Sequence, residues 1–470
     1  MKCSLAFDMG ATSIRGILGY VENGKLVTEE ILRFSHDRVK IDERSRWDWE
    51  KIINNISETI FKYKDKIESV GIDTWGVDFG ILDIHGNLIE NPISYRDPKN
   101  VIGYETAQKK MSLENIFMAT GNQIMSINTL FQILALKSQN EKSYEKIDKI
   151  LMIPDLVNFI LCGKKYSEAT ISSTSQLFNL EKNEFSNEIL EKFNIPSNFF
   201  APVIEQGDIL GTLKESKIEK LRELNIPVIS VASHDTASAA LLTKAFTDSE
   251  SLFLSCGTWS LIGCVTEKPI ITKEAFKNSL TNETGYGNSN MFFTNITGLY
   301  LLEKLKLQLE EKEQREISFE EINNYIKSNE KKIPYIDVGL PVFQGDEFDV
   351  MYEINKIIDK NLENPFDYFT LIYKSLAKKY NEVIKDIKNI TKRSFKRIHV
   401  IGGGAKSELL CQMIADYTEL EIIAGPFEAT AYGNILIQQI ALGKIKSIEE
   451  GFELISKSAK VYNYKPKNKF

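Results

Sequence analysis

The chain is poor in the residues that build disulfide frameworks and transition-metal sites. Its 470 residues include five cysteines and four histidines, and no two cysteines form a C-x-x-C pair. An odd number of scattered cysteines argues against a disulfide framework and against a thiolate zinc site. The few, widely spaced histidines leave little for a His-rich metal site. Hard oxygen ligands that hold magnesium are therefore the better expectation for any metal.

Excess positive charge and long apolar runs are missing as well. The formal net charge is −7, which disfavours nucleic acid or an anionic membrane as the main partner. No run approaches the length of a membrane span, and the opening MKCSLAFDMG reaches an aspartate too early for a signal peptide. We therefore expect a cytoplasmic protein with a small-molecule site and with no nucleic-acid or membrane partner.

Two segments of the chain show the same pattern of strand, glycine turn and strand. They are SLAFDMGATSIRGILGYV at 4–21 and SLFLSCGTWSLIGCV at 251–265. With an offset of 247 they share five identities, at Ser4/Ser251, Leu5/Leu252, Gly10/Gly257, Ser13/Ser260 and Gly16/Gly263. This likeness arises either by chance or from an internal duplication. If it is a duplication, the chain has two related halves, and each half opens with a hairpin. Because 470 residues exceed one ordinary core, we expect two domains, 1–243 and 244–470.

The first hairpin carries groups that suit a phosphate. Its Gly-Ala-Thr-Ser turn at 10–13 offers backbone N–H groups and hydroxyls that converge on one point. Asp8 ends the first strand, where it could hold magnesium through water, and Arg15 could neutralise a phosphate oxygen. Taken alone, this stretch also fits an ordinary hairpin with a surface Asp and Arg. Two such hairpins favour phosphoryl transfer, which needs its phosphates clamped.

Two further stretches have a structural and a functional interpretation. GIDTWGVDFG at 71–80 places Asp73, Trp75, Gly76 and Asp78 at the end of a buried strand. A tryptophan beside carboxylates suits a sugar, and it equally suits a hydrophobic core. The triple glycine at 402–404 precedes a helix, so its backbone could approach a ligand closely or simply form a turn.

The stretch VISVASHDTASAAL at 228–241 places a histidine and a carboxylate between a strand and an alanine-rich helix. The helix N-terminus favours the ionised form of Asp235. An ionised carboxylate at the carboxyl end of a central strand could take a proton from a substrate hydroxyl. On local grounds Asp235 could instead be only the N-cap of the helix, and His234 only a structural histidine.

Several blocks together resemble the FGGY family of carbohydrate kinases. The blocks are GIDTWGVDF, YRD (95–97), NTLFQ (128–132), VASHDTASA, LSCGTWSLIG, NITGLYLLEK and HVIGGGAKSELL, and they extend over nearly the whole chain. The resemblance implies an α/β fold of two actin-like ATPase (ribonuclease H-like) domains with a catalytic cleft between them. Within the family, GIDTWGVDF together with ASHDTASA is similar to members that phosphorylate L-rhamnulose.

The resemblance implies a reaction and a set of site residues. Asp235 would be the catalytic base that helps ATP convert L-rhamnulose to L-rhamnulose 1-phosphate in L-rhamnose catabolism, with Mg2+ near Asp8. The first domain would mainly bind the sugar and the second mainly the nucleotide. The sugar-binding residues would be Gly76, His234, Asp235, Thr236 and Asn295. The ATP-binding residues would be Ala11, Thr12, Ser13, Ile14, Arg15, Thr258, Glu303 and Gly403.

The chain departs from the family pattern at three places, and two other functions remain open. Ile14 stands where the family usually has glycine, Glu303 stands where a glutamine is expected, and Asn282-Glu283-Thr284-Gly285 replaces N-E-G-G. The first alternative is a family kinase for another ketose, such as L-fuculose or D-xylulose. The second is a non-catalytic, nucleotide-gated protein on the same scaffold, which would need no base in a sugar site. The sequence does not indicate an oligomeric state.

Overall fold

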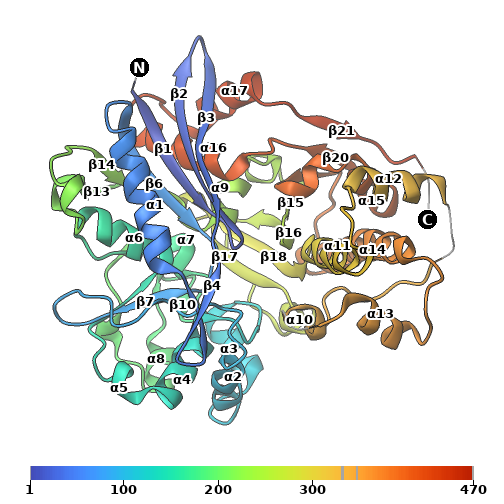
Figure 1. Ribbon diagram of the computed structural model, residues 1–470, viewed down its shortest axis with the longest axis horizontal. Coiled ribbons are helices and arrows are strands. Elements are labelled where there is room, and N and C mark those ends of the chain that lie inside the picture. Colours follow the sequence, from blue (N-terminus) through green and yellow to red (C-terminus); the bar gives the residue numbers. More distant parts are fainter. Residues whose placement is uncertain (1, 330–332, 346–347, 468–470) are drawn as a thin grey trace. The chain divides into compact units, whose positions relative to one another are not determined.

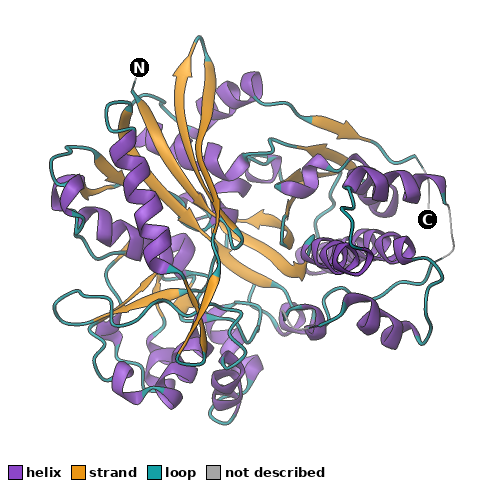
Figure 2. Cartoon of the chain, viewed as in Figure 1, coloured by secondary structure: helices purple, strands orange, loops and turns teal. Residues whose placement is uncertain are grey.

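A computed structural model describes residues 2–329, 333–345 and 348–467, with helices and strands distributed along the chain (Figures 1 and 2). The chain forms two compact units. Unit 1 comprises Met1–Leu242, Val265–Phe292 and Glu428–Lys460, and unit 2 comprises Thr243–Cys264, Phe293–Phe427 and Val461–Phe470. The chain therefore leaves unit 1 after Leu242 and returns to it twice.

The main sheet of unit 1 has the strand order β13-β14-β6-β1-β2-β3. Every residue of β1 is buried, as is typical of a central strand whose two faces are covered. β1 pairs antiparallel with β2 and parallel with β6, and β14 pairs parallel with β6. The carboxyl ends of β1, β6 and β14 consequently lie at one edge of the sheet. The strand bounds are β1 Cys3–Met9, β2 Ser13–Glu22, β3 Lys25–Ser35, β6 Ile67–Thr74, β13 Ile209–Thr212 and β14 Pro227–Ile229.

Helices α6 (Ile153–Cys162), α9 (Asp235–Ala240) and α16 (Ala429–Ala441) pack on this sheet, and α1 (Trp49–Lys62) packs against the 3-10 turn Glu219–Leu221. α16 packs on β1 and β6 and also against α9. The approach of α16 to α9 requires a glycine, because a Cβ at Gly433 would lie 2.0 Å from the carbonyl oxygen of Ser238. Gly433 therefore allows α16 to pack closely against α9.

The rest of unit 1 consists of shorter elements around an apolar cluster that includes Phe79, Phe131, Ile171 and Phe193. Two of its strands, β7 and β8, form a separate antiparallel pair. The helices are α2 Asn100–Gln108, α3 Leu113–Thr120, α4 Thr129–Gln139, α5 Glu141–Tyr144, α7 Ala169–Ser172, α8 Asn187–Phe193, α10 Lys273–Lys277 and α17 Ile448–Ser458. The strands are β4 Arg38–Ile41, β5 Arg44–Trp47, β7 Phe79–Leu82, β8 Lys149–Met152, β9 Ser167–Glu168, β10 Phe178–Asn179, β11 Glu184–Phe185, β12 Val203–Ile204 and β17 Thr281–Thr284.

Six strands of the second large sheet lie wholly or mainly in unit 2, in the order β18-β16-β15-β19-β20-β21. β15 pairs antiparallel with β16 and parallel with β19, and β19 pairs parallel with β20. This is the arrangement that β1, β2, β6 and β14 have in unit 1. The strand bounds are β15 Ser251–Cys256, β16 Trp259–Thr266, β18 Asn290–Thr297, β19 Arg397–Ile401, β20 Glu421–Ala424 and β21 Tyr462–Tyr464. The helices are α11 Tyr300–Glu313, α12 Phe319–Ser328, α13 Val350–Ile358, α14 Pro365–Thr391 and α15 Glu408–Thr418.

The two hairpins expected from the sequence are both present, but their turns differ in length. Four residues separate the paired Met9 and Ile14, whereas three separate the paired Cys256 and Ser260. With β1 placed on β15 at the offset of 247, the second arms are therefore out of step by one residue. The matches of Ser13 with Ser260 and of Gly16 with Gly263 are not between equivalent positions, because the turn in unit 2 is shorter.

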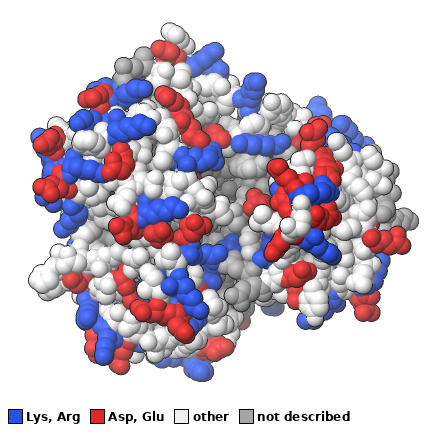
Figure 3. Space-filling model, in the orientation of Figure 1, with Lys and Arg blue, Asp and Glu red and all other residues white. Residues whose placement is uncertain are grey.

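The surface charge, the character of the helices and the state of the cysteines agree with what the composition predicts. On the face drawn in Figure 3, basic and acidic groups are interspersed. Among the described residues, no helix has the length and apolar character that spanning a bilayer requires. All five cysteines are buried, and none of them forms a disulfide with another described residue.

Candidate functional site

An ion-paired cluster lies at the carboxyl end of β1. The strand register places Asp8 opposite Arg15 on β2 and beside Asp73 on β6. The Arg15 guanidinium donates to the carboxylates of both Asp8 and Glu428. Asp8 and Arg15 were expected at this turn, whereas Glu428, which immediately precedes α16, was not. The charge of Arg15 is thus shared between two carboxylates of unit 1.

The turn between β1 and β2 presents polar groups at the surface of unit 1. Its Gly10 N–H donates to the Ser13 carbonyl at 3.0 Å. Ala11 and Ser13 are half-buried and Thr12 is exposed, so their backbone and hydroxyl groups are accessible. Ile14 is different, because its side chain is fully buried. Of the five residues predicted to hold ATP here, Ile14 could therefore contribute only backbone groups.

The fully buried Asp73 is part of an amide network that sequence reasoning missed. Its Oδ2 accepts a hydrogen bond from Asn434 Nδ2 at 2.6 Å, and Gln438 Nε2 donates to Asn434 Oδ1 at 2.7 Å. Burial, and then the neighbouring carboxylate of Asp8, raise the pKa of Asp73 well above its usual range. Asn434 and Gln438 lie one helical turn apart on α16, so a polar pair at i and i+4 in an apolar helix was the available signal.

Asp235 lies at the same edge of the sheet. The Thr74 N–H at the end of β6 donates to the Ser233 carbonyl at 2.8 Å, which brings the segment after β14 alongside β6. His234 occupies the N-cap position of α9, and Asp235 is the first helical residue. The Asp235 Oδ1 accepts the backbone N–H of Thr236 at 2.6 Å, and the Asp235 side chain is 30% exposed. Burial raises the pKa of Asp235 to about 6, and the charge of His234 opposes this rise.

His234 lies between two carboxylates. Its Nε2 is 3.4 Å from Asp235 Oδ1, and its Nδ1 is 3.1 Å from Glu283 Oε2 on β17. Burial lowers the pKa of His234, but Glu283 and the other carboxylates raise it more, so the net shift is upward. The sequence showed Glu283 only as part of a motif and did not indicate that it meets His234.

A second buried carboxylate, Glu168, holds the backbone of this segment. Its Oε2 accepts the N–H of Ser233 at 3.2 Å and the hydroxyl of Thr170 at 2.6 Å. The Thr170 oxygen in turn accepts the N–H of His234 at 3.1 Å. Burial raises the pKa of Glu168. Nothing in the local sequence around Glu168 predicts this role, because Ser233 lies 65 residues away along the chain.

The tryptophan of GIDTWGVDFG belongs to the core of unit 1. Trp75 and Trp47 both donate their indole N–H to Asp78 Oδ2, at 3.0 and 2.7 Å. Burial raises the pKa of Asp78 to about 6. Asp78 therefore fixes two buried rings, which favours the structural interpretation of this pair. Gly76 remains half-buried, and a Cβ there would lie 3.3 Å from Thr174.

In unit 2 the predicted nucleotide residues surround the turn of the second hairpin. The Gly298 N–H donates to the Thr258 carbonyl at 3.0 Å, which attaches this turn to the segment before α11. Glu303 lies exposed in the first turn of α11, and Asn295 is half-buried on β18. Thr258, Asn295 and Glu303 thus lie on consecutive elements of one unit.

Of the three consecutive glycines, two are explained by packing. Gly402 has φ +80°, and a Cβ there would lie 2.9 Å from the Cys256 carbonyl oxygen. A Cβ at Gly404 would lie 2.3 Å from Cys256 Sγ. Gly403 is exposed, and the nearest side-chain atom to its Cβ position is Leu299 Cδ1 at 3.7 Å. Only Gly403 is therefore free to face a ligand.

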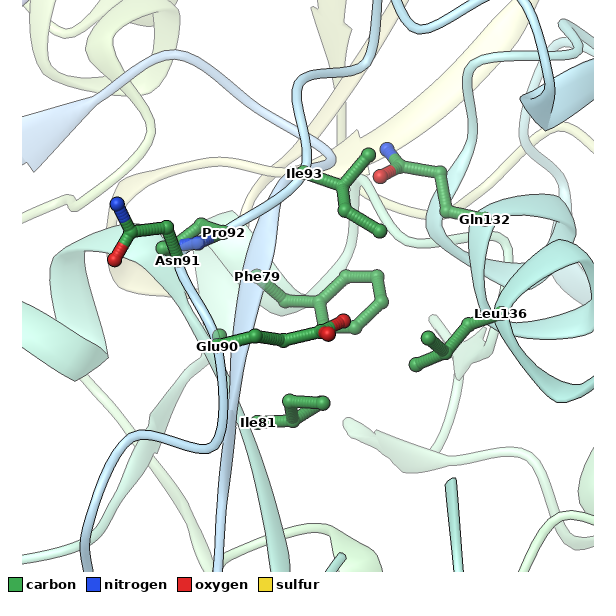
Figure 4. A pocket seen from close by; sticks show the side chains of 9 residues that line it. Phe79, Ile81, Glu90, Asn91, Pro92, Ile93, Gln132 and Leu136 are labelled. Atoms are coloured by element: carbon green, nitrogen blue, oxygen red, sulfur yellow. The ribbon is translucent and has the colours of Figure 1, made fainter. Parts of the chain in front are cut away.

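The donor set limits how magnesium could bind. Among the residues that the structure describes, no group of three or more His, Cys, Asp or Glu could hold a metal ion. Asp8 alone fits a magnesium ion that keeps most of its waters and takes its other ligands from phosphates, which is common for Mg2+ with nucleotides. The pocket of Figure 4 contains none of the predicted site residues. It is lined by Phe79, Gly80, Ile81, Glu90, Asn91, Pro92, Ile93, Gln132 and Leu136.

Comparisons with known proteins cover the whole chain. Residues 3–242 match the N-terminal domain, and residues 252–442 the C-terminal domain, of the FGGY family of carbohydrate kinases. The curated rhamnulokinases of Oceanobacillus iheyensis and Bacteroides thetaiotaomicron are each 34% identical to the chain. The matches cover 98% of this chain and 98% and 96% of those proteins.

Solved structures show the same fold. The xylulose kinase of Lactobacillus acidophilus superimposes with a TM-score of 0.81 at 17% identity, covering 99% of this chain and 94% of that one. The glycerol kinase of Plasmodium falciparum superimposes with a TM-score of 0.77 at 18% identity, covering 99% and 95%. The expected two-domain kinase fold is therefore confirmed, and the chain belongs to the FGGY family of carbohydrate kinases.

Proposed function

We propose that the chain is a rhamnulokinase, an ATP:L-rhamnulose 1-phosphotransferase that acts in the cytoplasm in L-rhamnose catabolism. The observation that carries the proposal is the partly exposed carboxylate of Asp235 at the carboxyl edge of the unit 1 sheet. It occurs in a chain that is similar to rhamnulokinases from end to end. A pure nucleotide switch would have no use for a carboxylate base beside a sugar.

In the proposed reaction Asp235 takes the proton of the C1 hydroxyl of the ketose. The hydroxyl oxygen forms a bond to the γ-phosphorus of ATP, the bond from that phosphorus to the β-phosphate oxygen breaks, and ADP leaves. Bound Mg2+ would neutralise charge on the phosphates during this transfer. The proton remains on Asp235 until solvent removes it, so atoms and charges balance.

The other predicted residues hold the two substrates. The ketose would be oriented by Gly76, His234, Thr236 and Asn295. The phosphates would lie on the Ala11–Arg15 turn and near Thr258, with adenosine beside Gly403 and Glu303. Asp8 would hold Mg2+ through water. The accessible Thr12 and Ser13 and the exposed Gly403 support these assignments.

A panel of ketoses tests the proposal. ADP release is measured with L-rhamnulose, L-fuculose and D-xylulose, and phosphorus–proton coupling in the NMR spectrum locates the phosphate on the product. We expect L-rhamnulose to have the highest kcat/KM and to be phosphorylated at O1. A higher kcat/KM for another ketose would make the sugar assignment wrong. A failure of every ketose to stimulate ATP turnover would favour the nucleotide-gated alternative.

A further inference from the structure

The side chains of Glu283, His234 and Asp235 form a line from the interior of unit 1 to its surface. Glu283 Oε2 is 3.1 Å from His234 Nδ1, and His234 Nε2 is 3.4 Å from Asp235 Oδ1. The side chains of Glu283 and His234 are 7% and 8% exposed, whereas that of Asp235 is 30% exposed. Asp235 is therefore the most exposed member of the line.

The facing atoms of the inner pair are each other's close polar neighbours. His234 Nδ1 and Glu283 Oε2 lie 3.1 Å apart, and neither atom has another hydrogen-bond partner among the described residues. An isolated buried carboxylate is costly, and an opposite charge beside it relieves that cost. A neutral imidazole presents an N–H to only one of the two flanking carboxylates, whereas the cationic form of His234 presents one to Glu283 and one to Asp235 together.

Both members of the inner pair are held by backbone hydrogen bonds. Next to Glu283, the Asn282 N–H donates to the Gly121 carbonyl at 2.9 Å and the Thr284 N–H donates to Ser173 Oγ at 2.9 Å. The N–H of His234 donates to Thr170 Oγ1. These bonds fix the backbone positions from which the two side chains meet.

The other charged groups that act on the line are Glu168, Asp8 and Asp73, together with Arg15. Glu168 on β9 faces His234 and favours its cationic form. Asp8 on β1 faces Asp235 and disfavours its ionised form, while Arg15 is paired with Asp8 and Glu428. The close positive charge that favours ionised Asp235 is therefore that of His234.

This inference rests on the proposed function. We propose that Glu283 is a positioning residue for the catalytic base. It holds the His234 imidazole as a cation against Asp235, and this cation keeps Asp235 ionised so that it can accept the proton of the sugar hydroxyl.

The first test measures His234 directly and needs no substrate. The chain has four histidines, so the resonances of His234 can be assigned by substitution and titrated by proton–nitrogen NMR. Glu283→Gln should lower the pKa of His234 by about one unit or more, since a charge at this distance is being removed. The matched control is Glu274→Gln, which removes the same charge from an exposed site of unit 1 and should leave His234 unchanged. Equal titration of His234 in both variants would overturn the proposal.

The second test is the pH profile of kcat/KM for L-rhamnulose. In Glu283→Gln the acidic limb of the profile should move to higher pH. At pH values below this limb kcat/KM should be lower by about tenfold or more, and it should recover at alkaline pH. Glu283→Asp keeps the charge and should restore the limb toward its wild-type position. A uniform loss at every pH with an unshifted limb would mean a merely structural role and would overturn the proposal.

Two outcomes separate this inference from the proposed function. If Glu283→Gln fails to fold, His234→Gln removes the same cation and should shift the acidic limb in the same direction; an unshifted limb in that variant overturns the proposal. If the wild-type protein turns over no ketose, the proposed function is wrong. In that case the NMR titration still decides whether Glu283 holds His234 as a cation.

Discussion

The hairpins that open the two units share a topology but differ in chemistry. In unit 1 the end of β1 is charged, because Asp8 pairs with Arg15 on one side and with Asp73 on the other. In unit 2 the equivalent residue, Ser255, pairs with Leu261 and the adjacent β19 ends in an apolar isoleucine. The same hairpin topology therefore ends in charged residues in unit 1 and in uncharged residues in unit 2.

This difference fits the roles that the proposed reaction assigns. The proposed base needs neighbours that control its ionisation, and unit 1 has such neighbours around Asp235. Unit 2 has glycine turns without carboxylates at Gly257 and Gly402–Gly404, which would let part of a nucleotide approach the backbone closely. The chemistry is determined by the side chains at the strand ends, because the strand pairing is common to both units.

The sharpest way to break this comparison is to remove the proposed base from unit 1. Asparagine is nearly isosteric, so Asp235→Asn should fold normally with a change in stability of at most about 1 kcal/mol. Turnover at saturating ketose should fall by about 10² to 10⁴, or roughly 3 to 5 kcal/mol of barrier. ATP affinity should persist. A variant that melts normally, binds ATP and keeps more than about a tenth of wild-type turnover would reduce Asp235 to a structural residue.

A fall in pH should change the stability of the two units in opposite directions, because it destabilises unit 2 through His399 and stabilises unit 1 through Asp78. In unit 2 the buried His399 accepts the N–H of Lys244 at Nδ1, and burial lowers its pKa to about 4. Because the unfolded value is about 6.5, the stabilisation is complete above that pH and is lost as pH falls toward 4, by about 3 kcal/mol. Urea unfolding of wild type and His399→Gln at pH 7 and pH 4 measures this difference. Parallel pH dependences would contradict it.

In unit 1 the buried Asp78 should show the reverse dependence. Burial raises its pKa to about 6, so the folded state retains a proton that the unfolded state has already lost. Its stabilisation is present below the unfolded value of about 4 and is lost as pH rises through 6, by about 3 kcal/mol. The free energy of unfolding of wild type should fall relative to Asp78→Asn over this range. A difference that is constant with pH would show that Asp78 is ionised throughout.

Substitution of a tightly packed glycine should mainly affect kcat in unit 1 and the KM for ATP in unit 2. Gly433→Ala places a Cβ 2.0 Å from the Ser238 carbonyl oxygen, which should displace α9 and cost about 1 to 3 kcal/mol of stability. Its kcat should fall with Asp235 displaced. Gly404→Ala instead meets Cys256 Sγ beside the hairpin of unit 2 and should mainly raise the KM for ATP. Steady-state kinetics of both variants, with each substrate varied in turn, measure kcat and the KM for ATP. A main effect on the KM for ATP in Gly433→Ala, or on kcat in Gly404→Ala, would contradict the prediction.

The smallest effect is expected from substitutions at the two equivalent strand ends. Asp8→Asn should lower kcat about tenfold and raise the Mg2+ requirement, because one carboxylate near the phosphates is lost. Sugar affinity should change little. Ser255→Ala at the equivalent place in unit 2 should leave both within about twofold, since about 0.4 kcal/mol is the scale of a minor polar contact. Loss of sugar affinity in Asp8→Asn as severe as its loss of turnover would make its assignment to the phosphates wrong.

Local patterns in the sequence predicted the elements and part of the site. The strand and glycine-turn patterns at 4–21 and 251–265 and the helix that starts at Asp235 are present. These features depend on neighbours within a few residues, which is the range over which periodicity and turn residues act. For the same reason the sequence did not show that the turn of unit 2 is one residue shorter, since register depends on the partner strand.

What the sequence by itself determined is the family, the two hairpins and the candidate base. What only the tertiary structure decided is the surroundings of that base. Glu283 meets His234 and Glu168 meets Ser233 across about 49 and 65 positions of the chain, and Asn434 reaches Asp73 across 361. Burial and opposing charge determine a pKa, and both arise from residues that folding brings together and that no local pattern connects.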